Sequence, residues 1–110
     1  MSETGFRALG KSVDVPEGYV MPYYLEDRKR RISVARAGGR LYAFDDLSTS
    51  DGAPLSSGRL TGTTIMSQCD GSRFEIASGA VLHGPATWPL AIYAAREQDG
   101  TIEVAVGVAR

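Results

Sequence analysis

The sequence is poor in the residues that bind soft metals: among 110 residues it has one cysteine, Cys69, and one histidine, His83. A single cysteine excludes a disulfide within the chain. It also argues against zinc or iron–sulfur sites built from this chain alone, because such sites need several thiolate or imidazole ligands. A catalytic role for His83 would require a nucleophile and an orienting acid, and the sequence places neither. We therefore expect no enzyme.

Long apolar runs and an excess of positive charge are also missing. No apolar run approaches the ~18 residues that would span a membrane, and the start lacks the basic and apolar segments of a secretory signal. We therefore expect a cytoplasmic protein with no membrane partner. The formal net charge of −1 argues against nucleic-acid binding. The basic run Arg28 to Arg31 is either a solvated hairpin or a docking patch for an acidic partner protein.

Turn-forming residues are abundant, with 13 glycines and 5 prolines, which favours a β protein. Gly38-Gly39 separates two alternating segments and predicts a two-residue hairpin turn. The core is expected around apolar residues of the strands (Ile32, Val34, Phe44, Ile65, Phe74, Ile92 and Val104). The segments expected to form strands are 19–25, 31–37, 40–44, 63–66, 73–76, 80–82, 90–95 and 101–106.

Three stretches between these segments are expected to be irregular: 45–62, 68–72 and the short turn 83–86. Long loops on a β scaffold are where binding residues tend to lie. Beside the third loop, Trp88 and Pro89 are expected to pack underneath it. An exposed Trp88 would instead indicate a partner surface.

The loops carry a recognisable spacing. Sixteen residues separate the segment Ser48-Thr49-Ser50 from the segment Ser67-Gln68-Cys69-Asp70-Gly71, and G-S-R-F (71–74) and G-P-A (84–86) follow. These segments resemble the two cluster-binding loops and the proline loop of Rieske ferredoxins. In that family the ligand pattern is C-x-H, about 16 residues, then C-x-x-H-G, with two cysteines on one iron and two histidines on the other.

The resemblance implies an all-β fold: a Rieske-like antiparallel β-sandwich with a small subdomain of the cluster-binding type. It implies one domain over 1–110, with the loop subdomain at about 45–86. The family role is electron transfer to an oxygenase or similar enzyme. The implied partners are a ferredoxin reductase or an oxygenase, and the implied cofactor is a [2Fe–2S] cluster.

By the same resemblance, this chain departs from the family at all four ligand positions. Oxygen donors there are poor substitutes for thiolate and imidazole, so we expect no cofactor. The proline loop is kept as Gly84, Pro85 and Ala86. The predicted former ligand positions are Ser48, Ser50, Ser67 and Asp70.

Two further features follow from the resemblance. Some Rieske proteins join the two loops by a disulfide, whose positions here are Ala53 and Cys69, so that crosslink is absent. Cys69 is then either an unpaired remnant thiol, or a redox-sensitive cysteine or the site of an intermolecular disulfide. The oxygen-bearing ligand positions are either inert or, with help from Asp46 or Asp51, an oxygen-only site for a hard cation.

Two functions stay open at this point. The chain is either an apo, redox-inactive variant of an electron carrier, with ligands replaced deliberately or lost naturally, or a natural cluster-less interaction or regulatory module. In both cases the missing crosslinks predict local opening at 47–56 and 67–72.

Overall fold

A computed structural model describes residues 5–106 of the chain. Within that range all regular elements are β-strands, apart from two short 3-10 turns at Ser12–Asp14 (η1) and Leu55–Ser57 (η2). No helix in this range is long and apolar enough to cross a membrane. The predicted all-β fold class is therefore confirmed.

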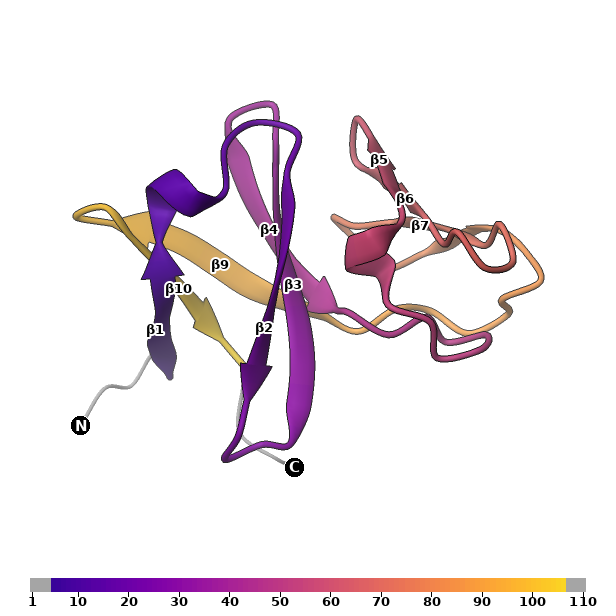
Figure 1. Cartoon of the computed structure of the whole chain (residues 1–110), viewed down its shortest axis with the longest axis horizontal. Helices are drawn as coiled ribbons and strands as arrows, with labels where there is room; N and C mark the ends of the chain where they lie inside the picture. Colours follow the sequence, from indigo (N-terminus) through magenta and orange to yellow (C-terminus); the bar gives the residue numbers. More distant parts are fainter. Residues whose placement is uncertain (1–4, 107–110) are drawn as a thin grey trace.

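The larger of two antiparallel sheets contains six strands and curls around its own core (Figure 1). Its strands are Phe6–Lys11 (β1), Val20–Leu25 (β2), Arg30–Ala37 (β3), Arg40–Asp45 (β4), Ile92–Gln98 (β9) and Thr101–Ala105 (β10). The order is β1-β10-β9-β4-β3-β2. Leu9 of β1 and Met21 of β2, at opposite edges, pack on the same buried cluster, which includes Ile32, Val34 and Val104. This shared core explains why the two edge strands approach each other.

The smaller sheet forms a separate lobe, on the right in Figure 1. Its strands are Arg59–Thr61 (β5), Thr64–Met66 (β6), Arg73–Glu75 (β7) and Val81–His83 (β8), in the order β5-β6-β7-β8. One face packs Ile65 and Phe74 against Leu55, Ile76 and Leu90, all buried. The long loops that precede and follow these short strands are thus attached to a real apolar core.

The strand predictions match the structure with instructive exceptions. The predicted turn at Gly38-Gly39 is present, and both glycines have positive φ. Strands β1 and β5 were not predicted: β1 lacks a clean alternation, and β5 lies within the stretch 45–62 that was expected to be irregular. The prediction that Ile92 belongs to the core is wrong, because its side chain is 41% exposed. Its side chain lies against Gly79, which has no side chain to cover it.

Candidate functional site

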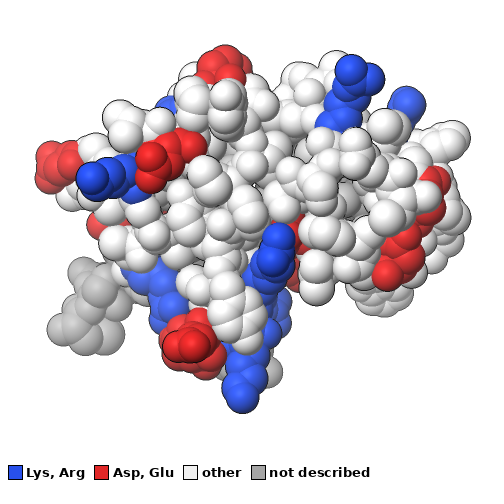
Figure 2. Space-filling model, viewed as in Figure 1, with Lys and Arg blue, Asp and Glu red and all other residues white. Residues whose placement is uncertain are grey.

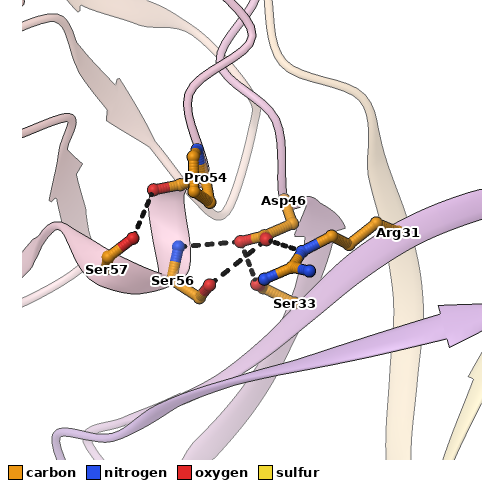
Figure 3. A network of polar contacts seen from close by, with 6 residues as sticks. All are labelled: Arg31, Ser33, Asp46, Pro54, Ser56 and Ser57. Atoms are coloured by element: carbon orange, nitrogen blue, oxygen red, sulfur yellow. Dashed lines mark hydrogen bonds and ion pairs between the residues drawn. The ribbon is translucent and has the colours of Figure 1, made fainter. Parts of the chain in front are cut away.

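The site is built where β4 leaves the large sheet, and its foundation is the fully buried carboxylate of Asp46. Figure 3 shows how this group joins β3 to the turn η2. Asp46 accepts hydrogen bonds from Arg31 Nε, from Ser33 Oγ (2.6 Å) and from the backbone N–H of Ser56 (2.7 Å). The first loop is therefore pinned at both ends by one side chain.

In the first loop, the two predicted ligand positions differ in exposure. Ser48 is buried, and its Oγ accepts a hydrogen bond from the backbone N–H of Ser50 at 3.2 Å. The Ser48 N–H donates to the Ala53 carbonyl (2.9 Å), and the Gly52 N–H donates to the Ser48 carbonyl (3.0 Å). Ser50 is exposed at the tip. The loop is thus a closed turn stabilised by its own backbone and by the hydroxyl of Ser48.

The second loop repeats this arrangement. Ser67 is fully buried, and its Oγ accepts from the Cys69 N–H at 3.3 Å. The Gly71 N–H donates to the Ser67 carbonyl at 3.0 Å, and the Ser67 N–H donates to the Ser72 carbonyl at 2.8 Å. Gly71 has φ of +79°, a conformation that glycine adopts without strain. Each serine therefore bonds the amide two residues ahead, as short hydroxyl side chains do in turns.

Asp70 is the charged member of the predicted ligand set. Its Oδ1 accepts from the Ser72 N–H at 2.9 Å. The pKa of Asp70 is lowered by this backbone hydrogen bond first and by the hydroxyl of Ser50 second. Because Ser50 belongs to the other loop, two predicted ligand positions from different loops meet here. The Oδ2 atom of Asp70 is buried and has no hydrogen-bond partner among the described residues.

The third loop completes the site. The Gly84–Pro85 peptide bond is cis, and the N–H of buried Ala86 donates to the Oγ of buried Ser72 at 3.0 Å. The three loops are therefore joined by protein hydrogen bonds.

Trp88 lies further along the third loop. Its carbonyl accepts from Thr49 Oγ1 at 2.6 Å, which links it to the first loop. The expectation that Trp88 packs under the loop is wrong, since its side chain is 72% exposed. That exposure is the feature that would indicate a partner surface.

The remaining candidates are not brought together. Cys69 is exposed and unpaired. His83 is an exposed residue of β8 rather than of a loop. Among residues 5–106, no group of three His, Cys, Asp or Glu side chains could hold a metal ion. Asp46, considered in the sequence only as an aid to a cation site, is instead fully engaged by donors of the protein itself.

Comparison with known proteins decides the family. The model of the Rieske [2Fe-2S] domain matches residues 6–94. The chain belongs to this family. It is 32% identical to ferredoxin CarAc of Metapseudomonas resinovorans over 74 residues (67% of this chain, 69% of the relative). It is 33% identical to the anthranilate 1,2-dioxygenase ferredoxin subunit of Burkholderia cepacia over 79 residues (72% and 73%). Relatives with these names agree with the prediction of a carrier-type protein rather than an enzyme.

Solved structures give the same result at the level of the fold. The Sphingomonas yanoikuyae B1 ferredoxin superposes with a TM-score of 0.85 at 27% identity, covering 92% of this chain and 98% of that one. A chain from the complex of reduced oxygenase and oxidized ferredoxin in carbazole 1,9a-dioxygenase superposes with a TM-score of 0.84 at 25% identity, covering 94% of both chains. The Rieske-like architecture is thus shared over nearly the whole length.

The expectation that no cofactor is associated with this chain is contradicted by these matches. The matching family is defined by a [2Fe–2S] domain, and the relatives are ferredoxins. The cofactor of the family is therefore a Rieske cluster. The sequence-based expectation gave more weight to the donor chemistry of the four predicted ligand positions than to the cofactor that the family resemblance implies.

The donors of this chain do not reproduce the ligand set of that cluster. A Rieske cluster is held by two cysteines and two histidines, whereas the two loops contain one thiol, that of exposed Cys69, and no imidazole. The buried donors at this position are the hydroxyls of Ser48 and Ser67 and one oxygen of Asp70. We therefore derive no electron-transfer step from these side chains.

Proposed function

We propose that this chain is a ferredoxin-family protein that docks on an oxygenase-type partner through the face formed by its three loops. A reductase is the second partner class that the family implies. We further propose that Ser48, Ser50, Ser67 and Asp70 occupy the family's ligand positions. With this donor set, the chain is either a natural interaction or regulatory module, or a redox-inactive variant of an electron carrier whose ligands were replaced deliberately or lost naturally.

The observation that carries the docking proposal is the presence of two exposed apolar side chains on loops that are hydrogen-bonded to each other. Trp88 is 72% exposed and Leu47 is 45% exposed, and Thr49, two residues after Leu47, is hydrogen-bonded to the backbone of Trp88. Exposed tryptophan on a rigid support is the residue type that most often dominates binding energy at protein interfaces. Ordering before binding reduces the entropy lost on association.

Hydrogen bonds within the protein keep this face in place. Asp46 anchors the first loop, Ser72 anchors the third loop to the second, and Thr49 links the first to the third. The docking face is therefore a property of the polypeptide. We keep the interpretation of one domain over 1–110 with a loop subdomain at about 45–86, and we expect a cytoplasmic location.

A binding measurement tests the proposal. The oxygenase of carbazole 1,9a-dioxygenase, which forms a complex with a structurally similar ferredoxin, serves as the probe in isothermal titration calorimetry. Trp88→Ala should weaken binding by about tenfold or more, as for an interface hot spot. The matched control is Tyr19→Ala: Tyr19 is a 59% exposed aromatic residue that precedes β2 near the Gly38-Gly39 end of the sheet. Equal effects of both substitutions, or no binding by the folded parent, would reject the docking face.

Cluster content distinguishes the two classes of function. Iron and acid-labile sulfide are measured on the same preparation, together with the visible absorption spectrum. Stoichiometric iron and sulfide would assign the electron-carrier role of the family. Oxygenase binding at substoichiometric iron would assign the interaction module.

A further inference from the structure

The outer face of the small sheet carries a row of basic side chains that the loop face does not use. The pairing of β5, β6 and β7 places Arg59 opposite Met66 and Met66 opposite Arg73. Residues directly opposite in antiparallel strands project from the same face, so the two arginines flank the methionine. Leu60, Ile65 and Phe74, at the alternate positions, pack into the core. The row therefore faces outward.

These side chains surround a concavity. Together with Thr61 and Thr64 they line a hollow of about 390 Å³. Neither Arg59 nor Arg73 has a hydrogen bond or ion pair to a side chain within residues 5–106. In contrast, Arg31 and Arg36 each have a carboxylate partner. The hollow thus has two guanidinium groups and two hydroxyls, but no acid to neutralise them.

The one carboxylate in the neighbouring row is occupied elsewhere. Glu75 pairs across the sheet with Thr64, and its two oxygens accept from Thr63 Oγ1 at 3.1 Å and from the Ala77 N–H at 3.2 Å. Figure 2 shows basic side chains at the top right, where Figure 1 places β5 and β6, with the acidic side chains of this lobe lower down. Glu75 forms no ion pair with Arg59 or Arg73 within residues 5–106, so both guanidinium groups keep their donors free for a ligand.

We propose that this arginine row is a second docking surface, which binds an extended segment of a partner protein that carries carboxylates at alternate residues. The two arginines stand on strands separated by β6, so their backbones are about 9.5 Å apart. Carboxylates at positions i and i+2 of an extended chain are about 7 Å apart on one side, within reach of two long, flexible guanidinium side chains. Arginine forms forked hydrogen bonds with carboxylates, and the pliable thioether of Met66 suits the apolar contacts between them.

The site is independent of the loop face. It is built from β5, β6 and β7, whereas Leu47, Thr49 and Trp88 belong to the first and third loops. A protein that uses both surfaces could hold two partners, or two parts of one partner, at the same time. Failure of the oxygenase-binding test would therefore leave this proposal standing.

Solution NMR of the full chain with a synthetic probe tests the arginine row. The probe is a hexapeptide in which glutamate alternates with threonine, and its reference replaces each glutamate with glutamine. We expect shift changes at the amides of Arg59, Thr64, Met66 and Arg73 with the glutamate peptide and none with the glutamine peptide. Arg59→Gln and Arg73→Gln should each weaken binding by about two- to fivefold, as for exposed charge pairs.

Matched variants and a second ligand define the outcomes. Arg40→Gln removes another exposed arginine, at the start of β4, and should leave binding unchanged. Arg59→Lys and Arg73→Lys keep the charge and should keep part of the affinity, which separates binding from folding defects. Inorganic phosphate causing the same shifts with equal affinity would overturn the proposal in favour of a small-anion site. Shifts centred on Arg28 to Arg31 would also overturn it.

Discussion

Replacing Asp46 with asparagine should destabilise the whole protein, although the change removes no volume. The carboxylate is fully buried and accepts from Arg31, Ser33 and Ser56 through both oxygens. An asparagine keeps one acceptor oxygen and presents an NH₂ group to donors on the other side. Either orientation of the amide therefore loses one of two bonds, that from the Arg31 guanidinium or that from the Ser56 N–H, and the negative charge that pairs with Arg31 is lost in both.

The magnitude follows from the exposure of the partners. A hydrogen bond to a charged group contributes about 1.5–3 kcal/mol, and a neutral one about 1 kcal/mol. Arg31 is 44% exposed, so water can solvate its guanidinium after the change. The loss should therefore stay below the roughly 3–5 kcal/mol of a broken fully buried pair. We expect the free energy of unfolding to fall by about 2–3 kcal/mol, a large part of the stability of a domain this size.

Urea unfolding followed by far-UV circular dichroism measures this change, and Asp99→Asn is the matched control. Asp99 is exposed in a turn with φ of +53°, where asparagine is well tolerated, so the control should shift stability by less than about 0.5 kcal/mol. Amide exchange at Leu55 and Ser56 should also accelerate in the Asp46 variant. A loss below about 1 kcal/mol with unchanged exchange at these amides would refute the assigned role of Asp46.

Three further changes have defined outcomes. Gly79→Ala should lower the free energy of unfolding, measured by urea titration, by at least about 2 kcal/mol. The new Cβ would lie 2.1 Å from the Leu90 carbonyl oxygen, at a φ of +83°. In the control Gly100→Ala, no atom lies near the new Cβ, so only backbone strain is expected. Burial first, and the hydrogen bond to Asp45 second, raise the pKa of Tyr93 to about 12 from 10.0. The contribution of its neutral hydroxyl to stability is therefore lost as pH rises from about 10 to 12. Urea denaturation across this window should show that the free energy of unfolding falls less steeply with pH in Tyr93→Phe than in the parent. A variant that places the family's ligand types at the four predicted positions (Ser48→Cys, Ser50→His, Ser67→Cys and Asp70→His) should raise iron and sulfide content and give visible absorption. A folded but colourless variant would contradict the predicted ligand positions.

Most of the large sheet was predictable because its strands alternate and its turns carry glycine. Ile32 and Val34 of β3 are fully buried, as predicted, and Gly38-Gly39 closes the hairpin. The alternation itself is incomplete, because Ser33 is also fully buried, where it donates to Asp46. Strand β1 was missed because its register shifts between Ala8 and Gly10. Such an irregularity breaks the period of two on which the pattern depends.

The sequence predicted where the loops lie but not their internal contacts. The spacing of Ser48, Ser50, Ser67 and Asp70 located two loops that the structure brings together through Ser50 and Asp70. The role of Asp46 was not predicted, because its donors come from β3 and η2, and pairing at that distance leaves no local pattern. A useful signal was an acidic residue directly after a buried strand end, where an unpaired carboxylate would be very unfavourable.

Hydrogen bonds of the polypeptide hold the loops in place in this member of the Rieske family. In a metal-bound protein, the metal and the polypeptide both contribute to the arrangement of the binding loops. Here Asp46, Ser72 and Thr49 form hydrogen bonds between different loops or at a loop base, and the hydroxyls of Ser48 and Ser67 close the turns. These bonds need no metal. The polypeptide itself therefore holds the three loops in their arrangement.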